Sequence, residues 1–175
     1  MIAKGHDVPT VTLVGLILAD LGLSLPSIRS SEKTFQLITQ AIGRAGRGEK
    51  TGRAIIQTYM PNHYSIVFGA KQDYQGFFIN EMQIRKLQQN PPYTFVSKMI
   101  ITSKNEDLVE QYIISTMELV SKNSNGSITC IGPTKPYVSK DGQGFKRECM
   151  FKYKNKMEFD RIIENIIKIL SKKAG

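Results

Sequence analysis

A glutamine and two arginines recur at helical spacing in the segment QAIGRAGRG, residues 40–48. An α-helix turns by about 100° per residue, so Gln40, Arg44 and Arg47 are expected on one face. Apolar side chains fall on the opposite face and would anchor the helix to a sheet; they are Phe35, Ile38, Ile42 and Ala45. An amide and two guanidinium groups held rigidly can donate hydrogen bonds to the oxygens of a phosphate that is being transferred. The pattern therefore predicts a site facing a nucleoside triphosphate, with a solvated basic face as the alternative.

The same segment nearly spells a phosphate-binding Walker A loop, GRAGRGEKT over residues 43–51. Glu49 interrupts the motif, and its carboxylate would repel the phosphates that such a loop cradles. The glycines also follow the expected helix, whereas a Walker A loop precedes one. No other segment supplies this motif or a strand-end acidic pair for magnesium. We therefore expect that the chain alone, lacking Walker A and Walker B motifs, does not hydrolyse ATP.

The elements that would position this helix have an α/β pattern. Residues 11–19 are almost wholly apolar, which predicts a parallel strand covered on both faces. A helix over residues 32–45 and a second buried strand over residues 52–58 follow. Asp20 ends the first strand, where open α/β sheets place their chemistry. A loop cap, or a salt bridge from Asp20 to Arg29 or Arg53, is the alternative.

The second half of the chain predicts a separate β-α-β-β-α domain. Residues 61–89 have a polar helical pattern, and the pair Pro91-Pro92 marks a boundary. Beyond it we expect strands at 95–102, 127–131 and 145–153, and helices at 105–121 and 156–172. The expected domains are 1–60, a helical connector at 61–92, and 93–175.

Cations and aromatic residues alternate in this second half, which suits nucleic acid: aromatic rings stack on bases and cations hold phosphates. The candidate DNA-binding residues are Lys146, Arg147, Lys152 and Lys154. Strand alternation places one set on one face, namely Phe145, Arg147, Cys149, Phe151 and Tyr153. The other face would carry Lys146, Glu148, Met150, Lys152 and Lys154. Alternatively, Phe151 and Tyr153 belong to the core, and the lysines only solubilise an edge strand.

Composition narrows the class of protein. The 175 residues carry a net charge of +9, which favours an anionic partner such as nucleic acid. The two cysteines, Cys130 and Cys149, lack the spacing of a metal site and suit reduced core thiols in a cytoplasmic protein. No apolar run reaches the length of a membrane span, so no membrane partner is expected.

Specific motifs resemble a known family. TQAIGRAGRG (residues 39–48) is similar to the sixth motif of superfamily-2 helicases, and residues 2–26 resemble their fifth. The combination of KGHDVP, ADLGLSLP, TFQLITQAIGRAGRG, IIQTY and KQDY is similar to the bacterial primosomal replication-restart helicases. The match is detailed over residues 1 to about 95 and looser beyond. Because the chain starts inside the fifth motif, we interpret it as a C-terminal fragment with a partial second RecA-like lobe of the P-loop NTPase type.

The resemblance implies roles for the sixth-motif residues. Arg47 matches the arginine finger, and Arg44 matches the companion arginine that contacts the γ-phosphate. Gln40 matches the glutamine that senses nucleotide across the motor cleft.

The fifth motif carries further implied roles near the start of the chain. Gly5 and Asp7 match positions that approach nucleotide and the DNA backbone. Lys4 would contact a phosphate. His6 would contact DNA or cap a turn.

For the full-length parent, the resemblance implies a 3′-to-5′ ATP-dependent DNA helicase that unwinds stalled or branched forks and directs primosome assembly. ATP and magnesium would be its cofactors, with zinc held by cysteines absent from this chain; the fragment alone would hold none of these. The implied partners are forked and single-stranded DNA, the acidic C-terminal peptide of single-stranded-DNA-binding protein, and other primosome proteins. The alternative is a non-catalytic basic module that binds nucleic acid or protein.

Overall fold

The protein combines helices and strands in two compact units, Met1–Ile84 and Arg85–Gly175. The computed structural model describes residues 11–45, 52–136, 138–142 and 144–174. The α/β class expected from the sequence is confirmed. The RecA-like character of the first unit and the division at residues 60 and 92 stay predictions.

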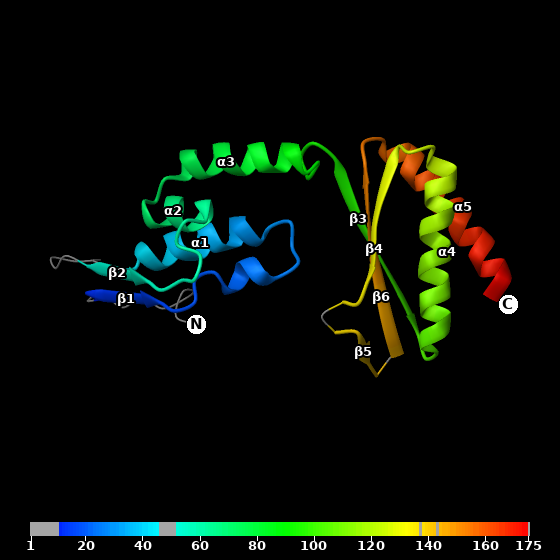
Figure 1. Ribbon diagram of the computed structural model, residues 1–175, viewed down its shortest axis with the longest axis horizontal. Coiled ribbons are helices and arrows are strands. Elements are labelled where there is room, and N and C mark those ends of the chain that lie inside the picture. Colours follow the sequence, from blue (N-terminus) through cyan, green and yellow to red (C-terminus); the bar gives the residue numbers. More distant parts are fainter. Residues whose placement is uncertain (1–10, 46–51, 137, 143, 175) are drawn as a thin grey trace. The chain divides into compact units, whose positions relative to one another are not determined.

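The first unit begins with a β-α-β crossover (Figure 1). Strand β1 (Leu13–Leu16) pairs in parallel with β2 (Arg53–Ile56), in a register that places Leu13 opposite Arg53. The connection contains the short helix η1 (Leu21–Ser24) and helix α1 (Ser30–Ile42), because parallel neighbours must be joined by a crossover. Ile38 and Ala41 of α1 pack against Leu16 and Ala19.

Strand β1 is shorter and more exposed than its apolar sequence predicts. Leu16 is buried, but Leu13 is 59% exposed and Ile17 is 77% exposed. Within the described residues β1 pairs with β2 alone, and α1 contacts it. The prediction of a strand covered on both faces is therefore wrong for this part of the chain.

Two further helices, α2 (Tyr64–Ala70) and α3 (Tyr74–Leu87), complete this region. Phe77 of α3 stacks on Phe35 of α1 with ring centroids 4.2 Å apart. Helix α2 lies close to α1 because Gly69 has no side chain. A Cβ atom at Gly69 would lie 3.0 Å from Cγ2 of the fully buried Ile38.

We predict that Gly69→Ala destabilises the protein by about 1–3 kcal/mol, because the added methyl group overpacks the contact with Ile38. Urea denaturation followed by circular dichroism measures the change. Gly15→Ala is the matched control, since nothing lies within 4 Å of a Cβ atom there. Equal stabilities of the two variants would contradict the packing argument.

The second unit is an antiparallel sheet with two helices (Figure 1). The strand order is β3-β6-β4, and the short strand β5 also pairs with β6. The bounds are β3 (Phe95–Ser103), α4 (Glu106–Ser124), β4 (Ile128–Thr134), β5 (Lys140–Asp141), β6 (Gly144–Tyr153) and α5 (Lys156–Ala174). The expected β-α-β-β-α order is present, with β5 as an added strand. No helix among the described residues has both the length and the apolar composition of a membrane span.

Strand β6 organises the core of this unit. Its residues alternate in burial as predicted, with Cys149, Phe151 and Tyr153 facing inward. Tyr153 stacks on Phe159 of α5 with centroids 3.9 Å apart, and its hydroxyl lies 2.8 Å from Oγ of Ser97. Phe151 and Tyr153 are therefore core residues. The alternative of an edge strand is wrong, because β6 pairs on both sides.

Candidate functional site

The C-terminal end of α1 carries the described part of the predicted nucleotide site. Phe35 and Ile38 are buried and Gln40 is exposed, as the helical pattern predicts. The helix ends at Ile42, three residues earlier than expected. The amides of Arg44 and Ala45 then bond to the carbonyls of Ala41 and Ile42, three residues back, instead of continuing the α-helical pattern.

Arg44 therefore lies in a tight turn and not on the helix itself. Its side chain is half-buried at a helix C-terminus, where the partial negative charge of the helix dipole favours a cation. Gln40 and Arg44 are brought to the same end of α1. Their polar side chains have the donor chemistry that a triphosphate requires, so the residues described here fit such a ligand.

Several predicted site residues lie outside the described residues. They are Arg47 of the sixth motif and Lys4, Gly5, His6 and Asp7 of the fifth. Their implied roles stay predictions.

Asp20 links β1 to the loop that follows β2. Its Oδ1 accepts a hydrogen bond of 3.2 Å from the backbone amide of Tyr59. A hydrogen bond from the side chain of Thr58 is the main reason that the pKa of Asp20 is lowered, against the opposing effect of burial. Asp20 thus caps a loop, which is one of the alternatives considered from the sequence. A role of Asp20 in strand-end chemistry stays a prediction.

The basic candidates of the second unit differ in what they contact. Lys146 forms an ion pair with Asp141 of β5. Lys152 donates a hydrogen bond of 2.8 Å to the backbone carbonyl of Gln88. Lys154 is exposed. Both Lys146 and Lys152 therefore have intramolecular partners that a DNA phosphate would have to replace.

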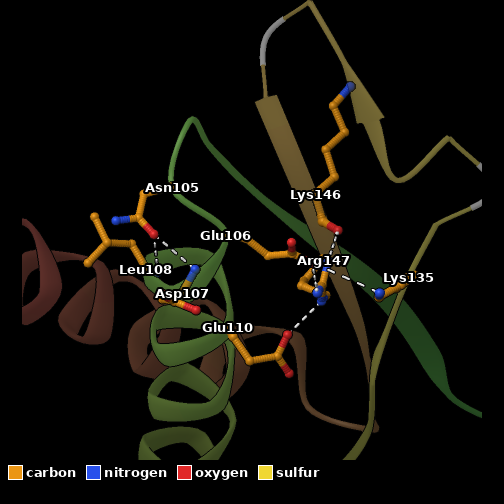
Figure 2. A network of polar contacts seen from close by, with 8 residues as sticks. All are labelled: Asn105, Glu106, Asp107, Leu108, Glu110, Lys135, Lys146 and Arg147. Atoms are coloured by element: carbon orange, nitrogen blue, oxygen red, sulfur yellow. Dashed lines mark hydrogen bonds and ion pairs between the residues drawn. The ribbon is translucent and has the colours of Figure 1, made fainter.

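The side chain of Arg147 is surrounded by residues of the second unit, on α4 and β6 (Figure 2). Its Nε lies 2.6 Å from Oε2 of Glu110, and its Nη2 lies 2.7 Å from Oε1 of Glu106. Its Nη1 donates to the backbone carbonyl of Lys146 at 3.0 Å. The side chain is only 8% exposed, so all three guanidinium nitrogens are satisfied in a largely buried position. We call this set of contacts the Arg147 network.

The geometry of the Arg147 network depends on helix α4. Asn105 caps α4 by accepting a hydrogen bond of 2.9 Å from the amide of Asp107, which fixes the first turn (Figure 2). Glu106 and Glu110 are four residues apart and so share the face that meets β6. Hydrogen bonding and attraction to Arg147 hold the pKa of Glu106 below its ordinary value, and Glu106 in turn raises the pKa of Arg147.

The two carboxylates are the residues that sequence reasoning missed. The sequence did contain a hint of these carboxylates, because alternation places the charged Arg147 on the buried face of its strand. A buried cation needs a carboxylate partner, and the i, i+4 pair on the preceding helix supplies two.

No family model matches the chain. It is 38% identical over 169 residues to replication restart protein PriA of Bacillus subtilis, covering 95% of this chain and 21% of that protein. It is 35% identical over 153 residues to the Synechocystis protein of the same name, and the match covers 87% of this chain and 18% of that protein. It is 30% identical over 163 residues to the protein of that name from Borreliella burgdorferi, and the match covers 93% of this chain and 25% of that protein.

These relationships place the chain in the class of replication restart proteins. It belongs to the family of replication restart protein PriA and spans about a fifth of the length of the curated relatives it matches. This confirms the family predicted from the combination of KGHDVP, ADLGLSLP, TFQLITQAIGRAGRG, IIQTY and KQDY.

The Arg147 network predicts a defined pH dependence of stability. Because the pKa of Glu106 is lowered on folding, its ion pair stabilises the folded state above the pKa of the unfolded chain. This contribution is lost as pH falls through the folded-state pKa. We expect Glu106→Gln to lower the urea midpoint at about pH 7 and to have a smaller effect at about pH 2, where more of the Glu106 carboxylate is protonated in the wild type.

Glu118→Gln is the matched control, since it makes the same chemical change at an exposed position of the same helix. Circular dichroism in urea at both pH values compares the two variants with the wild type. A Glu106→Gln effect that is independent of pH would show that the ion pair does not stabilise the fold.

Proposed function

We propose that this chain is the C-terminal part of an ATP-dependent DNA helicase that recognises stalled or branched forks and directs replication restart. The observation that carries the proposal is the relationship to replication restart proteins over 95% of the chain. The exposed Gln40 and the half-buried Arg44 at one end of α1 support it, because they supply the donors that the sixth motif requires.

In this proposal the first unit is part of the second RecA-like lobe, and it acts on nucleotide held by the other lobe of the parent. Gln40, Gly5 and Asp7 belong to the nucleotide side of the cleft. Arg44 and Arg47 stabilise the charge that develops on the transferring γ-phosphate. ATP and magnesium supply the phosphoryl chemistry in the parent, and zinc is held by cysteines of the parent outside these 175 residues.

The second unit is proposed as the part that binds DNA and partners. Its partners would be forked and single-stranded DNA, the C-terminal peptide of single-stranded-DNA-binding protein, and other primosome proteins. The net charge of +9 favours such anionic partners. The helicase would move 3′ to 5′ and work in the cytoplasm. A non-catalytic basic module is the weaker alternative, because it leaves the sixth-motif residues without a role.

The experiment uses the full-length parent with Arg47→Ala. We expect DNA-stimulated ATP hydrolysis to fall by about 10³-fold or more, the usual effect of losing an arginine finger. ATP binding should remain, because the nucleotide is held by the other lobe. A phosphate-release assay measures the rate.

Arg53→Ala, which removes the same charge from an exposed position of β2, is the matched control and should leave turnover unchanged. Wild-type turnover in Arg47→Ala would refute the motor assignment.

A further inference from the structure

The lysines of the second unit differ in what lies next to them. Some have a close partner: Lys98 pairs with Glu148 at 2.8 Å, and Lys156 pairs with Asp160 at 2.5 Å. Lys146 and Lys152 are engaged as described above. A second group lies near the start of α4 and consists of Lys104, Lys135 and Lys140. We call these three residues the lysine cluster.

Strand register brings the lysine cluster together. Phe145 of β6 pairs with Ser103 of β3 on one side and with Lys140 of β5 on the other. Adjacent strands are about 4.8 Å apart, so the backbones of Ser103 and Lys140 lie about 10 Å apart. Lys104 follows Ser103 directly in the chain. Two segments that are distant in sequence, the residues around Lys104 and those around Lys140, thus present cations at one end of the sheet.

Gly144 makes this close approach possible. Its φ is +126°, which side chains rarely adopt, and a Cβ atom there would clash with the carbonyl of Ser103. Lys135, which follows β4, lies 3.9 Å from Oε1 of Glu106 in the first turn of α4 (Figure 2). Its side chain is 67% exposed, so this pairing is weak and leaves the ammonium group accessible.

The nearby carboxylates offset only part of the charge of the lysine cluster. Lys146 neutralises Asp141, whereas Glu106 and Glu110 together carry one negative charge more than Arg147 balances. Asp107 is the exposed acid that remains at this end of α4. Lys140 lies over the ring of Phe145, with Nζ 4.3 Å from the centroid, which orients its side chain without neutralising it.

We propose that Lys104, Lys135 and Lys140 bind the phosphodiester backbone of DNA, and that Arg147 positions them without touching DNA. This inference rests on the proposed DNA-binding function of the second unit. Arg147 ties the first turn of α4, which follows Lys104, to β6, which pairs with the strand of Lys140. Through Glu106 it also fixes the group beside Lys135. Each lysine then neutralises phosphate charge and releases counterions.

The first experiment measures the affinity of the 175-residue chain for a fluorescent DNA fork over a series of salt concentrations. Lys104→Gln, Lys135→Gln and Lys140→Gln are each expected to weaken binding and to reduce the slope of log affinity against log salt by about one. Lys122→Gln and Lys168→Gln are matched controls at exposed positions of α4 and α5, and they should leave the slope unchanged.

A wild-type chain that binds DNA, with equal slopes for cluster and control variants, would overturn the lysine cluster but not the proposed function. No binding of the wild-type chain to DNA would count against the proposed function of the second unit instead.

The second experiment separates a positioning role of Arg147 from direct contact. Glu106→Gln and Glu110→Gln each remove a negative charge, which by electrostatics alone should strengthen DNA binding and free Arg147 for phosphate. If Arg147 is a positioning residue, both variants instead weaken binding several-fold, because the lysine cluster loses its support.

Asp107→Asn is the matched control: it removes the same charge from the same helical turn outside the Arg147 network, and it should strengthen binding slightly. Arg147→Lys should lower affinity without changing the salt slope, since a lysine cannot reproduce the three guanidinium contacts. Circular dichroism confirms that each variant is folded. Tighter binding by Glu106→Gln and Glu110→Gln, or an affinity of Arg147→Lys equal to that of the wild type, would overturn the positioning role.

Discussion

The second unit depends on a buried cation that must be neutralised where it lies. Arg147 points from the central strand β6 toward helix α4, and its side chain is only 8% exposed. A buried guanidinium without carboxylate partners would be strongly unfavourable, so α4 must begin where Glu106 and Glu110 can reach it. This requirement fixes the first turn of the helix against β6. The ends of β3, β4 and β5, with their lysines, are arranged around the same turn.

The first unit is held together by a different kind of contact. Apolar side chains of α1 pack against β1 and α2, and the absence of a side chain at Gly69 sets how closely the helices approach. The sheet itself is narrow in the described residues, and much of β1 is exposed. This packing holds one face of α1 in place, while the end of the helix that carries Gln40 and Arg44 stays accessible. That combination suits donors that act on a ligand held by another part of the parent protein.

The sequence predicted the order of the elements better than their exposure or their partners. Alternation along β6 correctly separated Phe151 and Tyr153 from the lysines, because burial on one face imposes a period of two. It placed Arg147 on the inner face but did not reveal Glu106 and Glu110, since long-range pairing leaves no local pattern. The end of α1 was misplaced because a tight turn and a helix contain the same residue types. The sequence also did not reveal that Lys152 bonds to the carbonyl of Gln88, a contact that only the folded chain can create.

The most direct test of the central claim is the Nε–H resonance of Arg147 in an NMR titration of the isotope-labelled chain with a DNA fork. The account predicts a resonance protected from solvent exchange by Glu110, with a chemical shift that stays constant while the signals of the surrounding lysine side chains move. Loss of that protection, or a shift of the Arg147 resonance that saturates with DNA, would mean that the guanidinium leaves its carboxylates to bind phosphate. The assignment of Arg147 to the fold would then be contradicted.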